Sequence, residues 1–128
     1  MLFRSARELT RKMKAHGASA WLVNTGWMGG PYGTGKRIDL PSTRNIINAI
    51  LNKSLDAAQF TRLPVFNLDI PLSVAGVPPQ LLDPRLSWNN SKDWDNAARS
   101  LAEKFIKNFS KFTSNEDTAK LATSGPKP

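Results

Sequence analysis

Apolar residues recur at helical spacing in three stretches of the chain. In the first stretch they precede Gly17, a typical C-terminal stop, which predicts a helix over about residues 5–16. The second helix is expected to begin at a Ser42 or Thr43 cap and to end near Asn52, with isoleucine and leucine side chains along one face.

The third stretch predicts the longest helix of the chain. Ser91 is expected to cap it, and Asp93 and Asp95 would stabilise the positive end of its dipole. One face carries a series of apolar residues, which are Trp94, Ala98, Leu101, Phe105, Phe109 and Phe112. Such an aromatic stripe is typical of a helix face that is buried in a core.

Two shorter segments have the pattern of strands. Residues 20–23 are continuously apolar, as in a buried strand, whereas residues 65–70 alternate between apolar and polar, as in a strand at a sheet edge. Prolines make residues 73–90 an irregular connector, and the polar residues after Thr113 predict a loose tail.

A loop crowded with glycine follows the first predicted strand. Five of the eight glycines of the chain lie there, together with the cations Lys36 and Arg37 at the end of the loop. Glycine adopts positive φ and has no Cβ, so this crowding indicates a sharp turn or a close approach of a ligand to the backbone. A glycine-rich surface turn with solvated cations is the plain alternative.

Residues 30–36 also fit the first seven positions of a phosphate-binding loop. The eighth position fails, because Arg37 replaces the serine or threonine that binds the metal. Pro31 removes one backbone donor, and the residues after Lys36 lead into Pro41 without a helix signal. These departures speak against a phosphate-binding loop.

Length and composition fit one domain. The chain has 128 residues, of which 40% are apolar, and this is enough for a hydrophobic core. It has no cysteine, so disulfides and thiolate metal sites are excluded, and no apolar run has the length of a membrane span. We therefore expect a cytoplasmic protein without a membrane partner.

The net charge of +8 raises an alternative, a small basic nucleic-acid-binding module. Arg4, Arg7, Arg11 and Lys14 fall near one helical stripe, and aromatic residues could stack on bases. The other basic residues are scattered and the aromatics follow apolar patterns, so solvated helix faces explain most of this charge. We therefore do not expect a nucleic-acid partner.

Several longer motifs carry a family resemblance. The segment WLVNTGW, the following GGPYG and GKRI, and the Thr43-Arg44 pair resemble the C-terminal part of ATP-dependent phosphoenolpyruvate carboxykinases. The likeness continues through LPVFNL, LDPR and the helix after Trp94 to the closing SGPK, and it covers nearly all of the chain from about Ala6.

The resemblance implies an activity and a place for this segment in it. Enzymes of this family convert oxaloacetate and ATP to phosphoenolpyruvate, ADP and carbon dioxide in gluconeogenesis, with magnesium and manganese. Their catalytic and metal-binding residues lie upstream, so none is expected here, and the chain alone is expected to be inactive. By position, Arg37 and Ile38 would contact the nucleotide, and Thr43 would form a hydrogen bond near the adenine.

Each of these three residues also has a plain alternative. Arg37 offers a planar cation that stacks on a base or binds an oxygen, and Ile38 offers apolar surface to one face of an adenine. Without the resemblance, Arg37 could be a solvated cation, Ile38 a core residue and Thr43 a helix cap.

The resemblance also implies the fold class, which is α/β. We expect the C-terminal part of a mixed-sheet nucleotide-binding domain over residues 6–113, with further strands supplied by the remainder of the catalytic domain. Residues 114–128 would form a polar tail. Residues 1–5 do not resemble the family and are expected to be a non-native lead-in.

Overall fold

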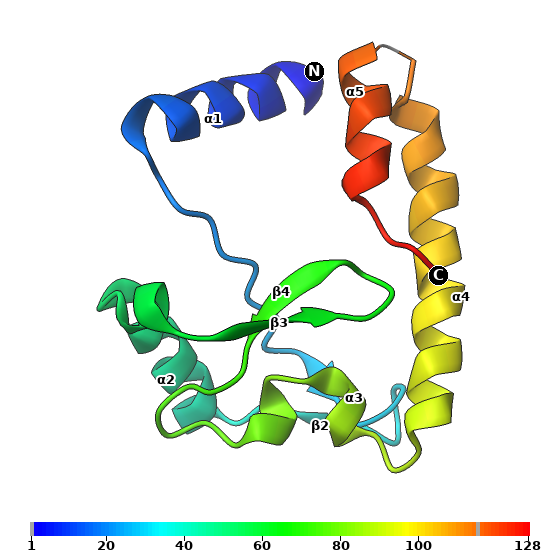
Figure 1. Cartoon of the computed structure of the whole chain (residues 1–128). Coiled ribbons are helices and arrows are strands. Elements are labelled where there is room, and N and C mark those ends of the chain that lie inside the picture. Colours follow the sequence, from blue (N-terminus) through cyan, green and yellow to red (C-terminus); the bar gives the residue numbers. More distant parts are fainter. Residues whose placement is uncertain (1, 115) are drawn as a thin grey trace.

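Helices and two small antiparallel hairpins alternate along the chain (Figure 1). The computed structural model describes residues 2–114 and 116–128. The longest helix, α4 (Ser91–Phe109), runs along one side of the structure, and both hairpins lie toward its first half (Figure 1). This mixture of helices and small sheets is consistent with the α/β class.

The glycine-rich segment forms the first hairpin. Strands β1 (Trp27–Met28) and β2 (Lys36–Arg37) pair antiparallel, with Trp27 opposite Arg37. Gly29, Gly30 and Gly33 in the loop have positive φ, as the sharp turn requires. The expected turn is confirmed.

The second hairpin corrects the expected strand over residues 65–70. Strand β3 (Phe60–Leu63) was missed, and it pairs antiparallel with β4 (Leu68–Pro71). Val65 and Asn67 have φ of 69° and 56°, so they lie in the turn between the strands. Pro64 precedes that turn, and the Pro64 carbonyl accepts a hydrogen bond from the Phe66 N–H.

The buried strand expected over residues 20–23 is also wrong. This segment pairs with no strand among the described residues, and Leu22 is 89% exposed. One ring contact joins this segment to β3 of the second hairpin: the ring centroids of Trp21 and Phe60 lie 6.0 Å apart. A continuous apolar run predicts a strand only where neighbouring strands cover it.

The three expected helices are present, but their starts differ from the prediction. Helix α1 (Leu2–His16) begins earlier than expected and ends before Gly17, whose φ is 60°. Helix α2 (Leu40–Leu51) is capped by Asp39, and α4 is capped by Asn90. The caps expected at Ser42 or Thr43 and at Ser91 are therefore wrong.

The core consists of two small clusters. Leu63 of β3 packs with Trp94 and Ala98 of α4, and the rings of Phe66 and Trp94 meet edge to face at 6.5 Å. The second cluster joins α2 to the segments after it and consists of Ala49, Leu55, Val74 and Val77. Both clusters are small, in keeping with a chain that leaves many large apolar side chains exposed.

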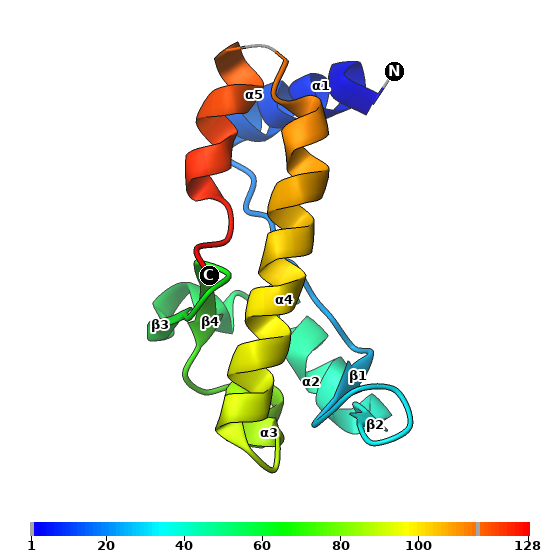
Figure 2. The same ribbon diagram turned by 90° about the vertical axis from the view of Figure 1, so that its right-hand side faces the viewer.

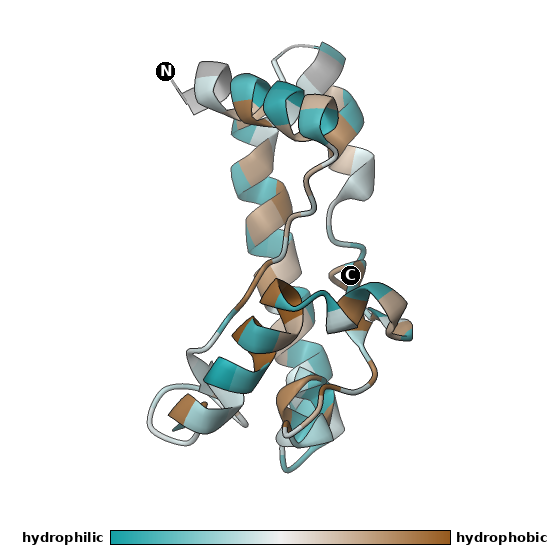
Figure 3. Ribbon diagram, turned by 90° about the vertical axis from the view of Figure 1, so that its left-hand side faces the viewer, coloured by the Kyte–Doolittle hydropathy of each residue, from teal (hydrophilic) through white to brown (hydrophobic). Residues whose placement is uncertain are grey.

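Only the first half of the aromatic stripe on α4 is buried. Ala102 is fully buried, but Leu101 and Phe105 are about half exposed, so the expectation that the whole face is core is wrong. Apolar residues continue along α4 beyond its buried part (Figure 3). There, helix α5 (Glu116–Leu121) covers the face only in part and leaves an apolar cavity of about 480 Å³.

The C-terminal residues, expected to form a polar tail, contain a short helix and a segment that returns to the second hairpin. After α5 and a short turn, η4 (Ala122–Ser124), the chain runs back along α4 to the second hairpin (Figure 2). The Lys127 N–H donates to the Val65 carbonyl at 2.6 Å. The connector over residues 73–90 likewise contains two short helices, η2 (Pro79–Leu81) and α3 (Pro84–Ser87).

The remaining domain expectations stay predictions. The lead-in expected over residues 1–5 begins at Met1, which lies outside the described residues. Within the part of the chain that the structure describes, no helix has the length and apolar character needed to cross a membrane.

Candidate nucleotide-contacting site

The three residues expected at the nucleotide lie close together in the chain, where β2 leads into α2. Arg37 is exposed at the end of β2, Ile38 is half-buried just after it, and Thr43 is half-buried in the first turns of α2. The Ile38 N–H donates to the Gly26 carbonyl at 3.1 Å, which extends the ladder of the hairpin by one residue. The junction is therefore held by backbone hydrogen bonds on the hairpin side.

The side chains of Arg37 and Ile38 lie on different faces of this hairpin, because neighbouring side chains of an extended chain point to opposite sides. Ile38 lines a mainly apolar cavity of about 610 Å³, whereas Arg37 and Thr43 do not line it. Trp27, the residue directly opposite Arg37 on β1, also lines this cavity. The structure thus brings the three residues to one junction but not into one cavity.

Sequence reasoning missed two aromatic residues of this hairpin, Trp27, which lies opposite Arg37, and Tyr32 in the loop. The ring of Trp27, which is 52% exposed, meets the ring of Tyr32 edge to face at 5.3 Å. An exposed indole is a surface on which planar rings stack. The sequence did hold a signal for Trp27: a hairpin centred on the glycine loop places Trp27 opposite Arg37.

The loop itself uses its amides internally. The N–H groups of Thr34 and Gly35 both donate to the Pro31 carbonyl, at 3.0 and 2.9 Å. A Cβ at Gly35 would lie 2.6 Å from the carbonyl oxygens of Met28 and Gly30, so the close turn admits only glycine there. This loop is built for a tight turn and not for wrapping a phosphate.

The start of α2 already holds a negative charge. The Asp39 carboxylate accepts hydrogen bonds from the Ser42 N–H at 2.7 Å and from the Ser42 hydroxyl at 3.0 Å. These bonds hold the pKa of Asp39 below its usual value. A carboxylate in this position repels a phosphate, and Lys36 lies in strand β2 and not at the start of a helix. Both features oppose a phosphate-binding loop.

Thr43 keeps part of its hydrogen-bonding capacity. Its hydroxyl donates to the Asp39 carbonyl at 3.0 Å, which occupies the only hydroxyl proton. The oxygen can still accept a hydrogen bond, so Thr43 can receive an N–H donor but has no proton left to give. Ser42 beside it is buried and serves the helix cap.

The charges elsewhere form local pairs. On α1, Arg11 makes a two-pronged contact with Glu8, at 2.9 and 2.6 Å, which neutralises part of the expected basic stripe. Within the described residues, no three histidine, aspartate or glutamate side chains converge as a metal site would require. The site therefore offers cationic, aromatic and apolar surface without a set of metal ligands.

Comparison with known proteins agrees with the motifs of this segment. The family model for phosphoenolpyruvate carboxykinase matches residues 3–80. The phosphoenolpyruvate carboxykinase (ATP) of Caldanaerobacter subterraneus subsp. tengcongensis is 44% identical over 122 residues, which are 95% of this chain and 23% of that protein. The chain thus spans about a quarter of the length of this relative. It belongs to the phosphoenolpyruvate carboxykinase family.

Proposed function

We propose that this chain supplies the adenosine end of the ATP site in a phosphoenolpyruvate carboxykinase. The complete reaction converts oxaloacetate and ATP to phosphoenolpyruvate, ADP and carbon dioxide, and we place it in cytoplasmic gluconeogenesis. One observation carries the choice of the adenosine end. The hairpin places Arg37 opposite the exposed Trp27, while the Asp39 carboxylate at the neighbouring helix start repels phosphates.

Each residue has a role that its chemistry supports. The guanidinium of Arg37 stacks on the base or binds a ribose oxygen, since its planar group can do both. Ile38 packs its apolar surface against one face of the adenine. Thr43 accepts a hydrogen bond from the exocyclic amino group of adenine, because its own proton is already given to Asp39.

The opposite directions of Arg37 and Ile38 restrict how the nucleotide can lie. No ring can stack on both side chains from one face of the hairpin. We infer that the base lies across the outer edge of β2, where it reaches Ile38 and Thr43, and that Arg37 approaches the ribose or the base from the other face.

The large apolar cavity beside Ile38 has a different role in this proposal. Its walls include the unpaired residues 20–23 together with side chains of β3, β4 and α2. We infer that strands from the remainder of the catalytic domain cover this apolar wall, which would complete the mixed sheet of which this chain is the C-terminal part.

Magnesium and manganese, which the family resemblance implies, do not fit the residues described here, because no carboxylate or histidine cluster could hold them. We derive no step through a metal from this segment. Assay of the purified chain with oxaloacetate, ATP and both metals should give no phosphoenolpyruvate above background. Formation of phosphoenolpyruvate above background would show that this chain carries catalytic groups, against the proposal.

The proposed role is tested in a full-length carboxykinase, called here the host enzyme, whose matching segment is replaced by this chain. Arg37→Ala should weaken ATP binding by about 1.5–3 kcal/mol, the range for hydrogen bonds to a charged group. Arg44→Ala, which removes an equal charge from an exposed position on α2, is the control and should change the affinity much less. Equal ATP affinity of Arg37→Ala and the unmutated host would remove Arg37 from the site.

A further inference from the structure

We propose that the ion pair between Arg85 and Asp95 positions the glycine hairpin, and with it Arg37, by holding α3 against α4. The part of this inference that concerns ATP rests on the proposed function above. Neither residue lies at the expected nucleotide contact, so both act as positioning residues.

The loop of the hairpin comes close to the end of α3. Gly29 has a φ of 78°, and a Cβ added there would lie 3.1 Å from the carbonyl oxygen of Ser87, the last residue of α3. The backbone of the loop therefore rests directly on the end of this short helix. A movement of α3 would displace Gly29, which comes directly after β1.

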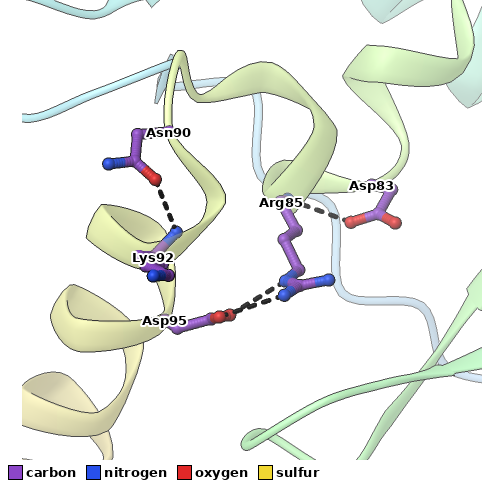
Figure 4. A network of polar contacts seen from close by, with 5 residues as sticks. All are labelled: Asp83, Arg85, Asn90, Lys92 and Asp95. Atoms are coloured by element: carbon purple, nitrogen blue, oxygen red, sulfur yellow. Dashed lines mark hydrogen bonds and ion pairs between the residues drawn. The ribbon is translucent and has the colours of Figure 1, made fainter.

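α3 is itself held from both ends. At its start, the Asp83 carboxylate accepts from the Arg85 N–H at 2.9 Å (Figure 4). Just after its end, Trp88 packs on the core cluster around Trp94. The Arg85 side chain reaches across to α4, where its Nε and a terminal nitrogen donate to the two Asp95 oxygens at 2.9 and 3.0 Å.

The contact between Arg85 and Asp95 is bidentate, which makes it directional. Two parallel hydrogen bonds between a guanidinium and a carboxylate fix both planes, which a single point charge cannot do. The side chains of Arg85 and Asp95 are 44% and 32% exposed, so the pair is partly solvated and lies at the edge of the packed region. Asn90, which caps α4 by accepting from the Lys92 N–H, holds the helix turn that carries Asp95 (Figure 4).

A second arginine–aspartate pair provides a matched control. On the other hairpin, Arg62 contacts Asp69 across the strands at 3.1 Å, and both side chains are 58% exposed. This pair lies on β3 and β4 and has no contact with α3 or the glycine loop among those described. Loss of Arg62 removes a similar charge pair without releasing α3.

The positional effect is measured first without nucleotide, by hydrogen–deuterium exchange of the chain with Arg85→Ala, Asp95→Ala and both changes. The peptide over residues 26–37 should exchange about two- to fivefold faster in all three variants, since a pair that acts as a unit is lost with either partner. Arg62→Ala should leave this peptide unchanged. Unchanged exchange in Arg85→Ala and Asp95→Ala, or an equal increase in Arg62→Ala, would overturn the inference.

The functional effect is measured in the host enzyme. Arg85→Ala should raise the KM for ATP about two- to fivefold, with little change in kcat or in the KM for oxaloacetate, because only the nucleotide-contacting hairpin is displaced. If the KM for ATP, the KM for oxaloacetate and kcat all worsened by the same factor, the damage would be general and the inference would be contradicted. If Arg37→Ala leaves ATP binding intact, the proposed function fails, while the exchange of the hairpin peptide still decides the role of the ion pair.

Discussion

The hairpins β1–β2 and β3–β4 are both short and antiparallel, but different forces hold them. In β3–β4, Leu63 is buried against Trp94, and the turn after it places Phe66 on the same indole. In β1–β2, Trp27 and Tyr32 stay exposed, and backbone hydrogen bonds and glycine geometry set the turn. Burial fixes the second hairpin, whereas local backbone geometry fixes the first.

This difference separates a structural element from a binding element. A hairpin without a buried face gains little from the hydrophobic effect, so its aromatic and cationic side chains remain available for a ligand. Its position then depends on a few contacts, of which the contact between Gly29 and Ser87 is one. The following predictions test this separation, starting with the largest expected effect.

Trp94→Ala should damage the buried hairpin most. Trp94 is only 5% exposed and contacts Leu63, Ala98 and Phe66, so its loss leaves a large cavity. We expect the free energy of unfolding of the chain to fall by about 3–5 kcal/mol, measured by urea denaturation followed by circular dichroism. Trp27→Ala, which removes an indole from the exposed hairpin, should cost less than about 1 kcal/mol. A similar loss of unfolding free energy in the two variants would contradict the claim that burial stabilises only the second hairpin.

Gly35→Ala should act on the exposed hairpin through its backbone. The added methyl group would collide with the carbonyl oxygens of Met28 and Gly30, which cannot move without opening the turn. We expect a cost of about 1–3 kcal/mol, expressed mainly as lost ATP affinity in the host enzyme and only slightly as lost stability of β3–β4. Gly33→Ala meets no neighbouring atom but requires a positive φ, so it serves as a milder comparison. Full ATP affinity in Gly35→Ala would contradict the role of this turn.

Acid should weaken the start of α2 before it affects the apolar contacts. The Ser42 hydrogen bonds lower the pKa of Asp39 in the folded chain, so its cap stabilises fully above the unfolded pKa of about 3.9. This contribution is lost as the pH falls through the lower folded value. Stability measured from about pH 6 to pH 2 should therefore decline less steeply in Asp39→Asn than in the unmutated chain. Parallel pH curves would show that the cap carries no such linkage.

The sequence predicted the helices better than their first residues. Hydrophobic spacing located α1, α2 and α4, but the capping oxygens come from Asp39, three residues before Ser42, and from Asn90, one residue before Ser91. The pattern over residues 65–70 merged a turn with β4, because apolar alternation does not report positive φ at Val65 and Asn67. Strand assignment of residues 20–23 failed since apolar character alone does not provide a pairing partner.

The candidate site was predicted from motif position, and that prediction stays open for Arg37, Ile38 and Thr43. The residues could be chosen from the segment GKRI and the following Thr43-Arg44 pair, and the family itself is confirmed. Periodicity could not reveal that Gly29 rests on Ser87, because these residues are distant in sequence. It could not reveal that Arg85 reaches Asp95 either, because the two residues belong to different helices whose packing the pattern does not report.

The central claim is that the β2–α2 junction contacts the adenosine end of ATP. The most direct test is a nuclear Overhauser measurement on the host enzyme with ATP, in which only isoleucine and threonine methyl groups carry protons. We predict magnetisation transfer from the adenine protons to the methyl groups of Ile38 and Thr43, with none to Ile106 on α4 as the internal control. Transfer to other methyl groups without Ile38 or Thr43 would contradict the account.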